Sequence, residues 1–391
     1  MPFLKHDRIT PAQVVILGFL FQILIGACLL SLPVATQSGE RVPFLDALFT
    51  ATSATCVTGL VIHDTALFWS PFGQGVILLL IQVGGMGVVT MAVAIFMFSG
   101  RKIGLKQRWV MQESISAPQV GGIVRMTGFI LKTAFLIEAI GALLLALRFC
   151  PQFGLGKGIW YGIFHAVSAF CNAGFDLMGE TGAFSSLTGY VGDPLVNLVI
   201  CLLIVVGGLG FLTWHDVAAH GRHVSQYRLQ SKLILLTTLA LLVGGFLFFR
   251  FYEFSRPQWA ALTGGERGLA ALFQSVSPRT AGFNTVDLTQ LSACSQLMTI
   301  LLMLAGGSPG STAGGFKTTT LAVLLLSVGA VIRRQGSARC FGRRLPDQVL
   351  RNACAIFLLY LVLFLAGGML ICCMDEIPLM QALFEAASAI G

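Results

Sequence analysis

Long apolar stretches are the feature of this sequence that most restricts its fold. Seven of them are each about long enough for a helix to cross the hydrocarbon core of a bilayer, which takes roughly 20 residues: 14–32, 76–98, 129–147, 195–214, 233–251, 297–331 and 355–373. The chain is 55% hydrophobic and only 11% charged, whereas soluble domains carry about 25% charged residues. Every backbone amide must be satisfied inside lipid, so the stretches are predicted to be helices. A closed barrel would show short alternating segments instead.

The lysines and arginines indicate how the chain is oriented. They gather in alternate connections, at 5–8, 101–125, 222–232 and 333–351, while the intervening loops hold few. Basic loops stay on the cytoplasmic side, so we expect a multi-pass protein of the cell (inner) membrane with a cytoplasmic N-terminus. The net charge of +8 is therefore expected to attract the membrane surface or a cytosolic subunit. No nucleic-acid partner is expected.

A second pattern repeats within the first. Short apolar segments that cannot span a membrane occur at 44–54, 159–170, 268–277 and 379–389, and polar turns with a glycine follow the first three, at 55–59, 171–174 and 279–282. Non-helical backbone at membrane depth survives only when it is buried in protein or lines a wet cavity. The pattern predicts an all-α membrane protein with four pseudo-symmetric helix–pore helix–helix repeats around one pore, at 12–98, 120–217, 231–332 and 350–391 (the last incomplete).

The turns are predicted to form a cation filter. A ring of backbone carbonyls can replace the hydration shell of a cation, and glycine allows the left-handed angles that turn successive carbonyls inward. The half-helices would aim their partially negative C-terminal ends at the centre. The alternative for a single turn is a re-entrant hairpin that packs against the protein without lining a pore. This alternative explains three such turns at equivalent positions poorly. The predicted filter residues are Cys56, Val57, Thr58, Gly59, Cys171, Asn172, Ala173, Gly174, Thr280, Ala281 and Gly282.

A glycine-rich segment, GGSPGSTAGG at 306–315, interrupts the stretch 297–331. It is predicted to form an intramembrane gate under the filter, with a passive kink as the alternative. Related glycine-rich segments at 84–87 and 207–210 are interpreted as close helix packing. Lys317 is expected either to act as a positive plug or to extend toward the interface. The predicted gate residues are Gly306, Gly307, Ser308, Pro309, Gly310, Ser311, Thr312, Ala313, Gly314, Gly315 and Lys317.

One segment matches the pattern of a catalytic motif without its sequence context. Residues 306–310 match the G-x-S-x-G pattern of hydrolases, which requires a strand–turn–helix context and a partnered histidine and acid. Because this copy lies within an apolar span, the chain is predicted not to be an enzyme, and an intramembrane hydrolase using Ser308 remains the remote alternative. Arg279, at the start of the third turn, is expected to pair with an acid such as Asp287 and brace that turn; the alternative is that it faces the pore mouth and affects the transport rate.

The segments TCVTGL (55–60), SAFCNAGF (168–175), RTAGFN (279–284) and the gate segment together resemble the Trk/Ktr/HKT superfamily of potassium transporters, and within it the KtrB-type membrane subunit. The resemblance implies four repeats in one chain, a homodimer, and potassium uptake gated with a ring of cytosolic nucleotide-binding regulatory subunits. It also implies a symporter, with sodium as a candidate coupling ion. Glycine rather than serine at 59 favours potassium, and a sodium- or ammonium-permeable pore is the alternative.

The spacing of the repeats carries one more expectation. A fourth filter glycine should fall about five or six residues after Ser388, beyond Gly391. We therefore expect the native chain to continue with another glycine-bearing turn and another spanning helix.

Overall fold

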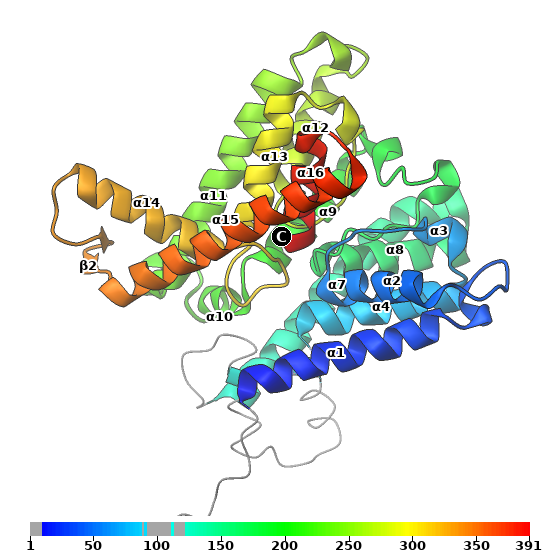
Figure 1. Ribbon diagram of the computed structural model, residues 1–391, viewed down its shortest axis with the longest axis horizontal. Coiled ribbons are helices and arrows are strands. Elements are labelled where there is room, and N and C mark those ends of the chain that lie inside the picture. Colours follow the sequence, from blue (N-terminus) through cyan, green and yellow to red (C-terminus); the bar gives the residue numbers. More distant parts are fainter. Residues whose placement is uncertain (1–9, 88–89, 92–110, 113–121) are drawn as a thin grey trace, which may run out of the picture.

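The computed structural model describes residues 10–87, 90–91, 111–112 and 122–391, and the structural statements below concern these residues. They form a helical molecule (Figure 1) whose one sheet is a short antiparallel hairpin, β1 (Arg339–Cys340) and β2 (Arg343–Arg344). The helices are α1 (Pro11–Leu30), α2 (Phe44–Cys56), α3 (Thr65–Phe68), α4 (Pro71–Met86), α7 (Ile123–Phe153), α8 (Leu155–Phe170), α9 (Pro194–Gly208), α10 (Phe211–His220), α11 (Leu229–Phe248), α12 (Gly264–Val276), α13 (Ala293–Ala305), α14 (Thr318–Ile332), α15 (Asp347–Asp375) and α16 (Leu379–Ile390). A π-helical turn, Phe249–Glu253, extends α11, and 3-10 turns lie in the connections.

A long helix followed by a shorter helix recurs along the chain. The short helices α2, α8, α12 and α16 occur where the sequence predicts half-helices, and each packs on the long helix before it, respectively α1, α7, α11 and α15. A further apolar helix follows the first three, and these helices are α4, α9 and α13. Figure 1 shows α16 close to α13, with which it is in contact.

Local sequence explains several helix starts. Thr10 caps α1 in a reciprocal capping box with Gln13, and Pro11 begins the helix. Asp193 accepts two backbone N–H bonds at the start of α9, again just before a proline. Such caps satisfy amide groups that the first helical turn leaves unpaired. They fix where these two helices begin, although the helix interiors are almost uniformly apolar.

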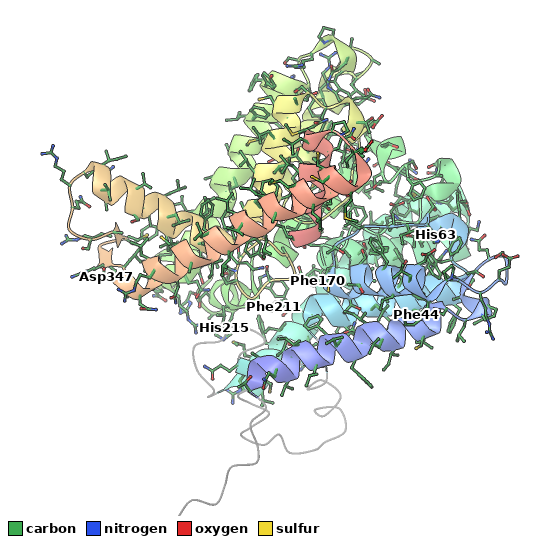
Figure 2. The ribbon with its side chains drawn as sticks, viewed as in Figure 1. Phe44, His63, Phe170, Phe211, His215 and Asp347 are labelled. Atoms are coloured by element: carbon green, nitrogen blue, oxygen red, sulfur yellow. The ribbon has the colours of Figure 1, made fainter. Side chains whose placement is uncertain are left out.

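The outer surface of the helices differs from that of a water-soluble protein. Large apolar side chains project from the outer helices, as Phe21 of α1 (67% exposed), Leu143 of α7 (62%) and Leu363 of α15 (58%) illustrate (Figure 2). Many buried side chains are polar, and a number of them lie in the glycine-bearing turns and the segment 306–317. Four described helices, together with the bent pair α9–α10, are long and apolar enough to cross a membrane. A mostly helical fold with several helices apolar enough to span a membrane is therefore confirmed.

Two expectations about the spans were wrong. The stretch 195–214 is not one helix, because α9 and α10 meet at an angle of 97° across Leu209 and Gly210. Segment 84–87 also ends a helix, since α4 stops at Met86 and Gly87 has φ +84°. The gate segment is thus not the only glycine-rich interruption of a span. The part of the predicted span 76–98 that covers 88–89 and 92–98 lies outside the described residues, as does most of the basic segment 101–125.

Candidate functional site

The three glycine-bearing turns share an unusual backbone. In each, a non-glycine residue adopts a left-handed conformation, namely Val57 (φ +60°), Asn172 (φ +59°) and Thr280 (φ +64°). The glycine two positions later does the same, with φ of +77°, +72° and +80° at Gly59, Gly174 and Gly282. Left-handed angles are costly for residues with a Cβ, above all β-branched ones. Three copies of the same strained turn indicate a local structure that the surroundings enforce.

The structure brings these three glycines together from distant parts of the chain. A Cβ added to Gly59 would lie 2.6 Å from the carbonyl oxygen of Ala173. One added to Gly174 would lie 2.8 Å from the carbonyl oxygen of Ala281 and 2.8 Å from the Cα of Gly282. Backbone therefore meets backbone at this point, and the predicted filter segments surround one common locus.

A serine at the end of each half-helix holds its turn. The carbonyl oxygens of Ser53, Ser168 and Ser277 accept the backbone N–H groups of Thr58, Ala173 and Ala281, at 2.9, 2.8 and 2.9 Å. The hydroxyl groups of the second and third serines also donate to backbone carbonyls beyond the turn, those of Phe175 and Phe283. The serines were visible in the sequence as a repeated position, but no role could be assigned to them there.

The helices behind the turns approach them closely at glycines. A Cβ on Gly84 of α4 would lie 2.0 Å from the carbonyl oxygen of Thr55, and one on Gly207 of α9 would lie 2.0 Å from that of Phe170. The close packing that was expected of segments 84–87 and 207–210 is therefore present, in addition to the helix breaks. Phe170 and Phe211, which Figure 2 labels, both pack against Trp214, with ring centroids 5.6 and 5.1 Å from that of the tryptophan.

The segment from Gly306 to Lys317, which we call the gate loop, connects α13 to α14. Its two ends are joined, since Gly307 N–H donates to Gly314 O (3.1 Å) and Thr318 N–H donates to Gly307 O (2.8 Å). Four of its residues have positive φ: Gly306, Gly310, Gly315 and Lys317. Thr312 and Gly314 contact the second and third turns, through Asn172 and Thr280. The gate loop thus lies directly beside two of the three turns.

Two cationic side chains belong to this region, Arg279, which is buried, and Lys317, which is half-buried. Lys317 does not extend outward: its Nζ donates to the carbonyl oxygens of Ala313 (2.6 Å) and Gly314 (3.2 Å). Arg279 is 3% exposed, and its Nε donates to Gly306 O at 3.3 Å. The expected pairing of Arg279 with Asp287 was wrong. The Asp287 carboxylate instead accepts from Thr289 beside it, which lowers the pKa of Asp287. Arg279 therefore binds the backbone of the gate loop instead of pairing with Asp287.

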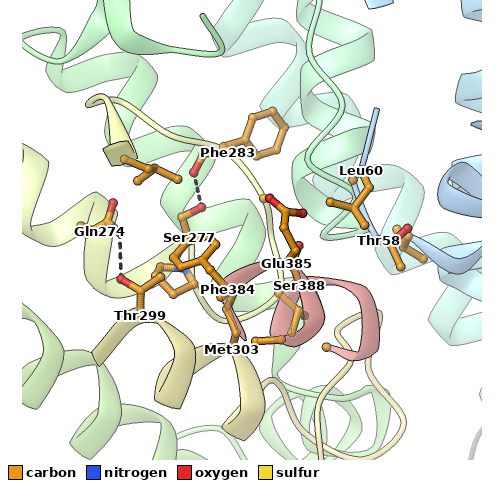
Figure 3. Close-up of a pocket in the computed structure, with 18 residues that line it drawn as sticks. Thr58, Leu60, Gln274, Ser277, Phe283, Thr299, Met303, Phe384, Glu385 and Ser388 are labelled. Atoms are coloured by element: carbon orange, nitrogen blue, oxygen red, sulfur yellow. Dashed lines mark hydrogen bonds between the residues drawn. The ribbon is translucent and has the colours of Figure 1, made fainter. Parts of the chain in front are cut away.

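A cavity of about 180 Å³ adjoins the first and third turns. Figure 3 shows Thr58 and Leu60 on one side, Ser277 and Phe283 on another, and Glu385 and Ser388 of α16 facing them. Cys56 has an exposed side chain and Cys171 a buried one that contacts Gly85, so the two cysteines do not converge. The predicted filter residues meet one another through backbone atoms and not through a shared set of side chains.

Known proteins match the chain along nearly its whole length. The TrkH family model, described as a cation transport protein, matches residues 11–391. The chain is 40% identical over 390 residues to the potassium/sodium uptake protein NtpJ of Enterococcus hirae, covering 99% of this chain and 85% of the relative. It is also 40% identical over 389 residues to the Ktr system potassium uptake protein B of Bacillus subtilis, covering 99% and 86%.

A solved structure has the same fold. The potassium transporter TrkH from Vibrio parahaemolyticus matches with a TM-score of 0.71 over 99% of this chain and 78% of that one, at 21% sequence identity. These relatives are transport proteins and not enzymes, so the G-x-S-x-G match at Ser308 has no catalytic meaning; in the structure its hydroxyl pairs with that of Thr318 at 3.0 Å. The resemblance to Ktr-type proteins is thus confirmed, and the chain belongs to the TrkH family of cation transport proteins.

Proposed function

We propose that this chain takes up potassium ions through a pore that the three glycine-bearing turns help to line. The observation that supports it most is the convergence of Gly59, Gly174 and Gly282, with backbone from three distant segments within van der Waals contact. A carbonyl ring can replace water around a weakly hydrated monovalent cation. The names of the potassium uptake proteins at 40% identity point to the same ion.

The half-helices add to the attraction for a cation. The helices α2, α8 and α12 end at or just before the turns, at Cys56, Phe170 and Val276. The C-terminal end of a helix carries a partial negative charge of about half an electron. In the proposal, four helix–pore helix–helix repeats, at 12–98, 120–217, 231–332 and 350–391, surround the pore. The cation then needs no side-chain carboxylate in the turns.

The gate loop would close this pore from the cytoplasmic side. Its glycines and small residues allow large backbone changes, and the ammonium group of Lys317 lies against two loop carbonyls, where it would repel an approaching cation. Opening requires a ligand or partner with higher affinity for the open form. We assign that role to a ring of cytosolic nucleotide-binding subunits acting on a homodimer.

Basic side chains support the docking of such a partner. Arg333, Arg334, Arg339, Arg343 and Arg344 are exposed around the β1–β2 hairpin and its approach. They suit an acidic protein surface or anionic lipid. The proposed partner thus meets the chain on the face that also carries the end of α14, the helix that follows the gate loop.

The test is rubidium uptake by cells that lack their own potassium uptake systems, with sodium or ammonium as competitor. Potassium should abolish rubidium uptake at concentrations at which sodium has little effect. The alternative, a pore permeable to sodium or ammonium, has support in the name of NtpJ, a potassium/sodium uptake protein. Equal competition by these ions would favour that alternative. Potassium uptake that requires sodium would identify sodium as the coupling ion.

A further inference from the structure

The gate loop and two filter turns are joined by buried hydrogen bonds that the transport proposal does not use. We propose that Thr312 and Asn172 tie the gate loop to the filter, so that the ion preference of the pore depends on whether the gate loop is seated. This inference rests on the proposed function, because it assigns a positioning role within the same pore.

Thr312 lies at the centre of the contact. Its hydroxyl hydrogen is between two acceptors, the carbonyl oxygen of Phe170 at 2.9 Å and Oδ1 of Asn172 at 3.1 Å. Thr312 is 7% exposed and Asn172 is 2% exposed, so both side chains are shielded from bulk solvent. Phe170 ends α8 and Asn172 is the left-handed residue of the second turn. One gate-loop side chain therefore holds both ends of that turn.

Asn172 carries the connection to the third turn. Its Nδ2 donates to the carbonyl oxygen of Arg279 at 3.4 Å, and Arg279 in turn donates to Gly306 of the gate loop. The next residue, Thr280, accepts the N–H of Gly314 on its hydroxyl at 2.9 Å. The second turn, the third turn and the gate loop therefore form a closed network, and none of the three can move far while the others stay in place.

The gate loop is also bonded to the break between α9 and α10. Thr312 N–H donates to Gly207 O (3.3 Å), Ser308 N–H to Gly208 O (3.0 Å) and Phe211 N–H to Gly310 O (2.7 Å). These backbone bonds fix the position from which Thr312 reaches the turn. When the gate loop leaves, the second turn loses its side-chain support, although Asn172 must still hold a strained conformation. The carbonyl ring is then free to change its shape, and with it the ion it prefers.

The experiment compares Thr312→Val, which keeps the shape and removes the hydroxyl, with Thr312→Ser, which keeps the hydroxyl. Both are made in the full chain, and rubidium uptake is measured with increasing sodium. Thr312→Val should raise uptake without a partner and lower the potassium-over-sodium preference about fivefold, the equivalent of one hydrogen bond of about 1 kcal/mol. Thr312→Ser should restore the preference of the parent.

Two further variants separate coupling from a general loosening of the loop. Ser311→Ala removes two bonds within the gate loop, from Ser311 Oγ to Ser308 O and from Ala313 N–H to Ser311 Oγ, and should lower the ion preference less than Thr312→Val does. Asn172→Gly removes the other partner while allowing the left-handed backbone. It should lower the preference as Thr312→Val does, and because the two residues share one bond, the double variant should lose less than the product of the two single losses.

The outcomes that would overturn the inference are distinct from those that concern the proposed function. A parent chain without rubidium uptake contradicts the transport proposal itself. A parent that transports, together with Thr312→Val and Asn172→Gly variants that keep the parental ion preference, contradicts the coupling alone. A loss of preference in Ser311→Ala equal to that in Thr312→Val would mean that any loosening of the loop suffices, and would remove the special role of Thr312.

Discussion

The glycines of the three turns lie where a side-chain carbon has no room. At Gly59 the nearest atom to an added Cβ is a carbonyl oxygen of the neighbouring turn, at 2.6 Å. Gly39 has nearly the same backbone, with φ +74° against +77°, but nothing lies within 4 Å of its added Cβ. The two positions therefore separate backbone strain from close approach.

Gly59→Ser should lower the preference for potassium over sodium about tenfold, because a displaced carbonyl changes the ring that surrounds the ion. Gly39→Ser introduces the same residue into the same conformation in open space, and should keep the parental preference. Sodium competition against rubidium uptake measures both. A Gly59→Ser variant with the ion preference of Gly39→Ser would show that Gly59 does not line the conducting path.

At this scale the sequence predicts the turns better than it predicts what holds them. The glycines stand out because they recur after similar half-helices. The bonds of Thr312 to Asn172 and of Arg279 to Gly306 join residues 140 and 27 positions apart, and no local pattern marks them. Asp287 is near Arg279 in the sequence, which suggested an ion pair, but its carboxylate accepts hydrogen bonds from Thr289 and Gln290 instead.

At the scale of elements, the break between α9 and α10 shows what hydropathy cannot detect. The stretch 195–214 is apolar throughout, so its composition fits one span. The bend arises because Gly210 adopts φ +88° against the carbonyl oxygen of Pro309, 2.6 Å from where its Cβ would be, and because Phe211 N–H finds a partner in the gate loop. The helix is broken by a segment a hundred residues further along the chain.

Removing 307–314 should raise uptake in the absence of a partner and reduce the effect of the partner. The deletion needs little movement of the flanking chain, since a Cβ on Gly306 would lie 2.7 Å from the Cα of Gly315. Rubidium uptake with and without the cytosolic subunit measures the effect, with the amount of inserted protein as control. If the variant inserts normally but its uptake stays as low and as partner-dependent as in the parent, the loop is a kink and the gate lies elsewhere.

Glu253 connects the end of α11 to the turn that contains Trp259 and to the start of α13. The side chain is fully buried in the π-helical turn after α11. It accepts from Trp259 Nε1 at 2.9 Å and from the hydroxyls of Ser292 and Ser295, both at 2.6 Å. Glu253→Ala leaves these donors buried without a partner, and should lower the free energy of unfolding by about 3 kcal/mol.

Thermal unfolding of the purified protein in detergent measures that change. Glu40→Ala, which removes an exposed carboxylate, serves as the control and should leave the unfolding temperature nearly unchanged. Equal unfolding temperatures for the two variants would mean that the Glu253 network contributes little to stability.

At the scale of the whole molecule, the outward apolar faces and the basic connections together predict an orientation. The loop after α1 and the loop before β1 should lie on opposite sides of the membrane, the second in the cytoplasm. Gly39 and Gly336 lie in these loops, and added Cβ atoms meet nothing within 4 Å at either, so a short epitope fits at both.

An epitope after Gly39 should bind antibody on intact spheroplasts, whereas one after Gly336 should bind only after permeabilisation. Rubidium uptake by each tagged chain confirms that the insertion leaves the fold intact. The opposite labelling pattern would reverse the orientation inferred from the lysines and arginines, and would place the β1–β2 hairpin away from any cytosolic partner.

The gate loop touches two turns through different residues, Thr312 at the second and Gly314 at the third. In a ring of identical subunits every contact occurs once per subunit, so each turn would have its own copy of the loop, and copies that each reach two turns would compete for the same place. A chain whose turns come from unequal stretches escapes this restriction. If the turns line the pore as proposed, the backbone around the ion can stay nearly symmetric, whereas the gate loop, which contacts two of the turns, need not be.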